Sequence, residues 1–71
     1  MQVQFTVSLN RNAWSLDRGQ SHVSDYPSRE HALEAAENFA RAVTARGERA
    51  VVKVMTEGRV EESRSFAPDI F

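Results

Sequence analysis

The 71-residue sequence has no cysteine, only three glycines and two prolines, and no long apolar run. Without cysteine, disulfides and thiolate metal sites are excluded, and a reducing cytoplasm is the expected location. The glycines are isolated from one another, so none belongs to a phosphate-binding loop. The first residues, MQVQFTVS, alternate between polar and apolar, and we therefore expect no secretory signal. No stretch approaches the roughly 20 apolar residues of a membrane span.

An excess of charge of one sign is also missing. Nine basic and ten acidic side chains leave a net charge of −1, which argues against a dedicated nucleic-acid or membrane binder. The length predicts a single domain over residues 1–71. A domain of this size buries only about 60% of the surface that its unfolded chain exposes. Small chains without disulfides or metals often gain stability by forming oligomers.

Residues 28–47 form the clearest pattern in the sequence, which is that of one amphipathic helix. Ser28 is a good N-cap residue, and Gly47 suits the left-handed conformation that ends many helices. Leu33 and Phe39 are the only large members of the apolar stripe, and alanines dominate the rest of it. The alanines predict that the helix lies close to its partner layer, with Leu33 and Phe39 as the large anchors. The stripe consists of Ala32, Leu33, Ala36, Phe39, Ala40 and Val43.

Two predicted strands precede the helix. Residues 2–9 alternate between apolar and polar, as a half-buried strand does, and residues 13–17 resume as a second strand after a turn at residues 10–12. Together they predict a hairpin. Residues 22–28 are mostly polar, and we interpret them as a connection in which Val23 and Tyr26 tuck under the helix.

Two more predicted strands follow the helix, at residues 49–56 and 59–66, joined by a turn at Glu57 and Gly58. If Thr56 faces Arg59, simple counting pairs Met55 with Val60 and predicts a cross-strand ion pair between Lys53 and Glu62. The third strand is apolar on both faces, as expected of a central or doubly covered strand. The fourth is polar at most positions, which suits a charged edge. The fold class predicted is α+β: a four-stranded antiparallel sheet in ββαββ order, with one helix packed on one face.

Several features recur in a fixed order along the chain, at Trp14, Gly19, residues 21–23, residues 28–36, Gly47, Val51, Val52, Gly58, Arg59, Ser65 and Phe66. Their order and spacing resemble those of the "domain of unknown function 2188" family of small bacterial proteins. The resemblance covers nearly the whole chain. It differs at Ala67, where the family tends to have glycine, and in extra helix residues at 42–45. The resemblance implies a ββαββ arrangement and no settled activity, so no functional residue is carried over.

Catalytic and metal-binding patterns do not emerge from the sequence. His22 and His31 are the only imidazoles, and neither has a carboxylate at a spacing that makes a familiar ligand pair. His31 with Asp25 or Glu34 is the one pairing to consider. None of the serines sits in a Gly-x-Ser-x-Gly elbow. We therefore expect no enzyme, no cofactor, no metal and no small-molecule substrate.

Two surfaces remain as candidates for function. The first would bind single-stranded nucleic acid through basic side chains beside an aromatic platform, at Trp14, Arg49, Lys53, Arg59 and Arg64. Interleaved glutamates at positions 57, 61 and 62 weaken that hypothesis. The second would join copies of the chain through apolar side chains at Val51, Met55, Ile70 and Phe71. The preferred hypothesis is a non-enzymatic interaction module that self-associates, most simply as a homodimer, with weak nucleic-acid binding as the alternative.

Overall fold

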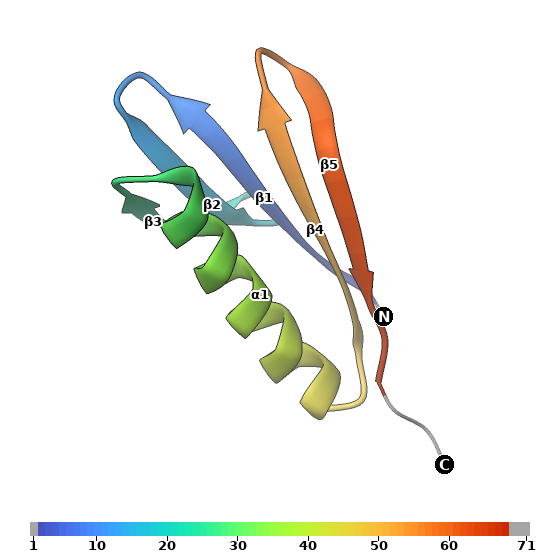
Figure 1. Ribbon diagram of the computed structural model, residues 1–71. Coiled ribbons are helices and arrows are strands. Elements are labelled where there is room, and N and C mark those ends of the chain that lie inside the picture. The colour runs from blue at the N-terminus through green and yellow to red at the C-terminus, as the bar shows by residue number, and fades with distance from the viewer. Residues whose placement is uncertain (1, 69–71) are drawn as a thin grey trace.

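The computed structural model describes residues 2–68 and consists of one sheet with one helix on it (Figure 1). Within the sheet the strand order is β3-β2-β1-β4-β5. The β1–β4 pair is parallel, and the other neighbouring pairs are antiparallel. The elements in chain order are β1 (Gln2–Asn10), β2 (Ala13–Arg18), β3 (Ser21–Tyr26), α1 (Arg29–Ala45), β4 (Arg49–Thr56) and β5 (Arg59–Phe66).

The prediction of a four-stranded antiparallel sheet is therefore wrong, because the described residues form a mixed sheet of five strands. Ser21–Tyr26, interpreted above as a connection, is the strand β3 at one edge of the sheet. Its mostly polar side chains are only partly covered, so it lacks the apolar alternation that predicts a strand. With this extra strand, the chain enters α1 travelling in the opposite direction to the one predicted, and β4 therefore returns parallel to β1.

The helix prediction is confirmed at both ends. The Ser28 side chain accepts a hydrogen bond from the backbone N–H of His31 at 3.2 Å. At the other end, Gly47 has a φ of 88°, and its N–H donates to the carbonyl of Thr44 at 3.0 Å. The N–H of Glu48 donates to the carbonyl of Val43 at 3.2 Å. These two bonds form a Schellman motif, which satisfies carbonyls that the helix itself leaves unpaired.

The core lies between α1 and the middle of the sheet, and its largest members come from the strands. Phe5 is only 1% exposed, whereas Phe39 is 42% exposed and stacks on Phe5 with ring centroids 6.0 Å apart. The expectation that Phe39 and Leu33 are the large anchors is therefore wrong for Phe39, and Leu33 is only partly buried. Alanines of α1 bring the helix close to the sheet. The buried apolar residues are Phe5, Val7, Leu16, Ala32, Ala36, Ala40, Val43, Ala50, Val52 and Val54.

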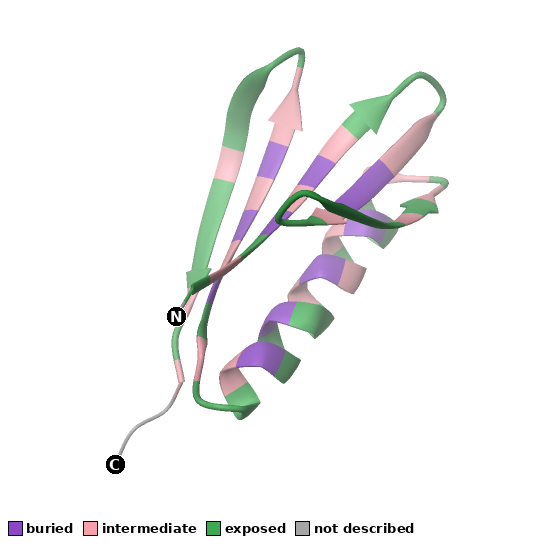
Figure 2. Ribbon diagram, turned by 180° about the vertical axis from the view of Figure 1, so that it is seen from behind, coloured by how far each residue is buried: buried purple, intermediate pink, exposed green. Residues whose placement is uncertain are grey.

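Both outer strands carry a β-bulge. In the β4–β5 ladder, Val54 pairs with Glu62 and Met55 pairs with Val60, so Glu61 is the extra residue. In the β2–β3 ladder the extra residue is Val23. Seen from behind, β3 and β5 are largely exposed, whereas the inner strands alternate between buried and less buried positions (Figure 2). Bulged, polar edge strands discourage edge-to-edge pairing with another sheet.

Candidate functional site

The helix covers one face of the sheet and leaves the other face open. The buried side chains of Phe5 and Val7 point toward α1, so the alternate positions Gln4, Thr6 and Ser8 point to the opposite side. Residues paired across neighbouring strands share a face, and the pairings therefore assign the rest. We call this surface the open face; it comprises Gln2, Gln4, Thr6, Ser8, Asn10, Ala13, Ser15, Asp17, His22, Asp25, Arg49, Val51, Lys53, Met55, Val60, Ser63 and Ser65.

The apolar side chains of the open face gather on the β4–β5 side. Val51 and Met55 are half-buried on β4, and Val60, which pairs with Met55, is 53% exposed. Lys53 lies between Val51 and Met55 on the same face of β4, and the uncharged side chains of Gln4, Ser8 and Ser65 flank the patch on β1 and β5. An apolar patch of this kind on a sheet face is a candidate surface for contact with another protein.

A polar cluster occupies the β2–β3 side of the open face. His22 Nδ1 lies 3.0 Å from Asp17 Oδ1, and His22 Nε2 lies 3.4 Å from Asp25 Oδ1. Ser15 is 8% exposed, and its Oγ donates to Asp25 Oδ1 at 3.0 Å. A nucleophilic serine needs a base that takes its proton, and here the serine proton is directed at a carboxylate, not at the imidazole. This arrangement orders the edge hairpin and does not form a Ser–His pair.

The other imidazole belongs to the helix start. His31 Nδ1 lies 2.6 Å from Ser28 Oγ, so its side chain joins the N-cap. It forms no hydrogen bond or ion pair with Asp25 or Glu34, the partners considered from the sequence. Within residues 2–68 no group of three or more histidine and acidic side chains is placed to hold a metal ion, and no pocket is found.

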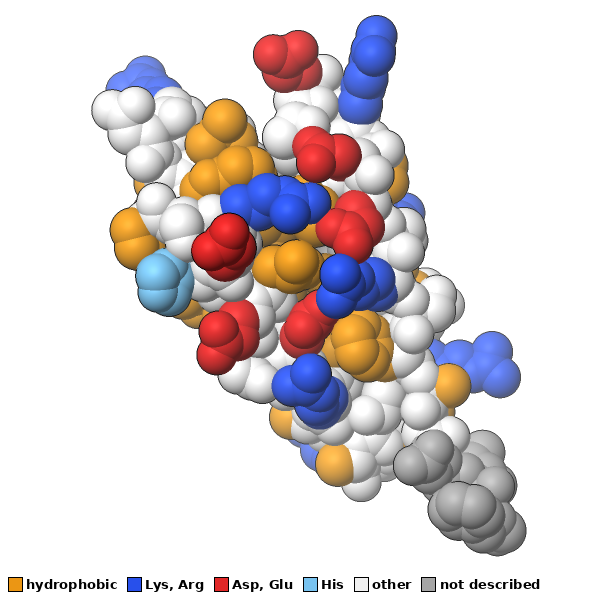
Figure 3. Space-filling model, in the orientation of Figure 1, with side chains coloured by type: hydrophobic (Ala, Val, Ile, Leu, Met, Phe, Trp, Pro, Cys, Tyr) orange, Lys and Arg blue, Asp and Glu red, His pale blue; other side chains and the backbone are white. Residues whose placement is uncertain are grey.

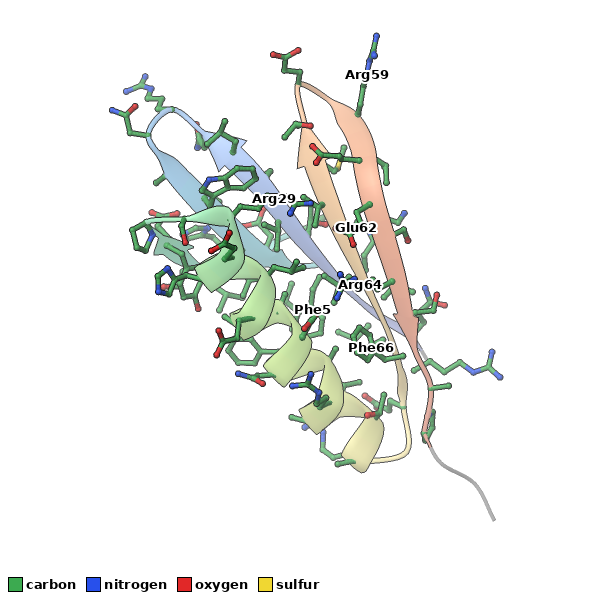
Figure 4. The ribbon with its side chains drawn as sticks, viewed as in Figure 1. Phe5, Arg29, Arg59, Glu62, Arg64 and Phe66 are labelled. Atoms are coloured by element: carbon green, nitrogen blue, oxygen red, sulfur yellow. The ribbon has the colours of Figure 1, made fainter. Side chains whose placement is uncertain are left out.

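On the helix-covered face, charged side chains fill the space between α1 and β5. We call this set the charged layer; it comprises Arg29, Glu37, Arg41, Glu61, Glu62 and Arg64. Arg29 contacts Glu62 at 3.0 Å, and Arg64 contacts Glu62 at 2.9 Å and also bonds to Glu37. Figure 3 shows the alternating signs across this side of the molecule, and Figure 4 shows Arg29, Glu62 and Arg64 directed into the space. The charged layer thus connects α1 to the edge strand β5, with which the helix has few other contacts.

Glu62 gives the charged layer a dependence on pH. Its pKa lies below the ordinary value of 4.5, chiefly because its carboxylate accepts a hydrogen bond from Arg64, with Arg29 contributing further. A carboxyl group with a lowered pKa in the folded state stabilises that state above its unfolded pKa, and this contribution is lost as the pH falls through the folded pKa. We expect Glu62→Gln to lower the free energy of unfolding at pH 7 and to make its decline below about pH 4.5 shallower. Urea titrations at pH 7 and at pH 3 measure both effects.

Glu57→Gln is the matched control for this prediction. Glu57 is exposed in the β4–β5 turn and forms no ion pair within residues 2–68. Its substitution should leave the pH dependence of unfolding close to that of the wild type. An equal change in both variants would show that Glu62 has no special role.

The residues proposed for nucleic-acid binding do not share one surface. Trp14 packs against the core on the helix-covered face. Arg64, on the same face, is engaged by Glu37 and Glu62. Arg59 lies at the tip of the β4–β5 hairpin (Figure 4). Only Arg49 and Lys53 lie on the open face, so the structure does not bring a basic cluster together with an aromatic platform.

The residues proposed for self-association fall into two groups. Val51 and Met55 lie on the open face of β4, on either side of Lys53, and Val60 of β5 joins them, although the sequence pattern did not indicate it. The turn already predicts that Met55 pairs with Val60, and this pairing could have identified Val60 as part of the apolar patch. Ile70 and Phe71 lie outside the described residues.

In residues 2–68 no helix is both long and apolar enough to cross a lipid bilayer. No model of a protein family, no curated protein and no solved structure gives a significant match to the chain. The resemblance to the "domain of unknown function 2188" family therefore stays a prediction.

Proposed function

We propose that the protein is a non-enzymatic interaction module that self-associates, most simply as a homodimer, through the open face of its sheet. The observation that carries the proposal is that the helix covers only one face of the sheet. On the other face, half-buried Val51 and Met55 lie beside the exposed Val60. Sheets bury such faces by packing against a second layer. A cytoplasmic location completes the proposal, and a chain without cysteine fits it.

The edges of the sheet are poorer candidates than its face. Both edge strands are interrupted by a bulge, at Val23 and at Glu61. β5 also carries charged side chains along its length. These are the devices by which proteins keep sheet edges from pairing. These features of the edges support the open face as the surface of the proposed association.

We expect Met55→Glu to weaken dimerisation at least about 10-fold, because it places a charge where the apolar patch would be desolvated. The matched control is Leu9→Glu. Leu9 is 50% exposed but belongs to the opposite face, at the tip of β1. Size-exclusion chromatography with light scattering over a range of concentrations measures both variants. A wild type that stays at 8.0 kDa up to high micromolar concentration would overturn the proposal. Equal weakening by the two variants would show that the open face is not the interface.

A further inference from the structure

The charged side chains of the open face are segregated by sign. Asp17 and Asp25 lie on β2 and β3, on one side of the central strand β1. Arg49 and Lys53 lie on β4, on the other side. Thr6 of β1 pairs with both Asp17 and Lys53, so the three residues form one row across the sheet with the neutral side chain in the middle. The open face therefore has an acidic half and a basic half.

Lys53 has no ion-pair partner within residues 2–68, although it is half-buried in the middle of the sheet. The sequence predicted that Glu62 would pair with it. The bulge at Glu61 shifts the register, so Lys53 faces Ser63 and Glu62 turns to the charged layer on the other side. Asp17 is similarly available, since His22 approaches only one of its two carboxylate oxygens. Lys53 and Asp17, which lie on opposite halves of the open face, can therefore each form a further ion pair.

We propose that two copies stack open face to open face about a two-fold axis parallel to β1, which places Lys53 of each copy opposite Asp17 of the other. The inference rests on the proposed self-association and specifies its geometry. Rotation about this axis exchanges the two sides of the sheet but keeps each row in place, so basic and acidic halves meet twice. A lysine and an aspartate directed at each other together span the about 10 Å between packed sheets.

The other simple arrangement has its two-fold axis running across the strands. That axis stacks β4 on β4 and β2 on β2, so Lys53 and Arg49 of both copies gather together, as do the four aspartates. Like charges facing each other in an interface are strongly unfavourable. The segregation of charge by side, and not by row, favours the axis along the strands, and this axis also sets Met55 of each copy over Ser15 of the other.

The open face is large enough for a specific contact. The five strands hold six to nine residues each, and at about 3.3 Å per residue and a strand spacing of about 4.8 Å they give a footprint of roughly 500–600 Å² per copy. Stacking two such faces removes roughly 1,000 Å² of surface from water. This is the lower bound for a specific interface, and it indicates a moderate affinity.

Charge reversal tests this geometry with two variants, Lys53→Asp and Asp17→Lys. Alone, each variant would place two like-charged pairs in its own homodimer, and we expect each to dimerise at least about 10-fold more weakly than the wild type. Mixed together, the two variants restore both oppositely charged pairs, and we expect the heterodimer to dominate. Native mass spectrometry separates the two chains by mass and counts homodimers and heterodimers in one spectrum. Circular dichroism and urea unfolding establish that each variant is folded.

The double variant, Lys53→Asp with Asp17→Lys in one chain, gives an independent test because its homodimer again pairs opposite charges. Recovery of wild-type dimerisation in the double variant, together with the heterodimer, supports the axis along β1. Weakening by Met55→Glu without any effect of charge reversal would leave the open face as the interface and overturn this geometry. Single variants that do not recombine, or a double variant that stays monomeric while folded, would also overturn it. A monomeric wild type would overturn both proposals.

Discussion

Phe5→Ala is expected to lower the free energy of unfolding by about 3–5 kcal/mol, the largest effect of any single truncation in this chain. Phe5 is 1% exposed, lies on the central strand and contacts Phe39 of the helix on one side, while the Arg18 guanidinium lies 6.0 Å from its ring centroid. The loss combines the transfer free energy of the ring with a cavity under α1. Domains of this length have a total stability of roughly 4–11 kcal/mol, so the variant should be partly unfolded. Urea titration followed by circular dichroism measures the change.

Phe39→Ala is the comparison that makes this prediction sharp. Phe39 is 42% exposed, so its removal leaves no closed cavity, and we expect a loss of about 1–2 kcal/mol, mostly from stacking and partial burial. If Phe5→Ala proves too unstable to titrate, Phe5→Leu should remain folded and lose about 1 kcal/mol. A larger loss for Phe39→Ala than for Phe5→Ala would contradict the described core.

Ala36→Leu has the second largest expected effect, a loss of about 1–3 kcal/mol caused by overpacking. Ala36 is fully buried at the middle of α1, where Ala32 and Ala40 lie one turn to either side, also fully buried. The small side chains set the distance between helix and sheet, so three added carbon atoms must push the two layers apart or take strained rotamers. Thermal and urea unfolding report the loss.

The control for Ala36→Leu is Ala42→Leu. Ala42 is exposed on the same helix, and leucine and alanine have similar helix propensities, so stability should change by less than about 0.5 kcal/mol. A stabilising effect of Ala36→Leu would mean that space remains between α1 and the sheet, contrary to the packing described above.

The helix could be predicted well from the sequence because its determinants are local. Ser28 at the start, Gly47 after the end and the alanine-rich stripe each act within a few residues along the chain. The structure places all three as predicted. Phe39 contributes less to the core than the sequence predicts. Periodicity gives the direction of a side chain but not how far the sheet extends beneath it.

The topology was mispredicted because of one element. β3 is an edge strand whose exposed positions are polar, and periodicity alone does not separate such a strand from a loop. A local signal was present: Gly19 and Gln20 form a two-residue turn between β2 and β3, with Gly19 at a φ of 60°, and such turns are typical of hairpins. A prediction that lacks β3 reverses the direction of every later element. For this reason the sequence predicts an antiparallel sheet where the protein has a mixed one.

The open face was out of reach of the sequence for a related reason. Its charge pattern depends on which strand lies on either side of β1, and that follows from the topology. The bulge at Glu61 matters equally: simple counting from the turn gives Lys53 to Glu62, whereas the actual register leaves Lys53 facing Ser63. A one-residue bulge has no reliable signature in a polar edge strand. Val51 and Met55 could be nominated because a strand that is apolar on both faces is visible in the sequence.

We propose above all that the sheet face opposite α1 is a contact surface between copies of this chain. Isotope-filtered NOE spectroscopy on a mixture of labelled and unlabelled protein tests it most directly, because the filtered spectrum reports only contacts between chains. Cross-peaks should come from Thr6, Lys53 and Met55 on the open face and be absent from Leu33 and Phe39 on the helix side. A filtered spectrum without cross-peaks at millimolar concentration, or one dominated by α1 side chains, would contradict the claim.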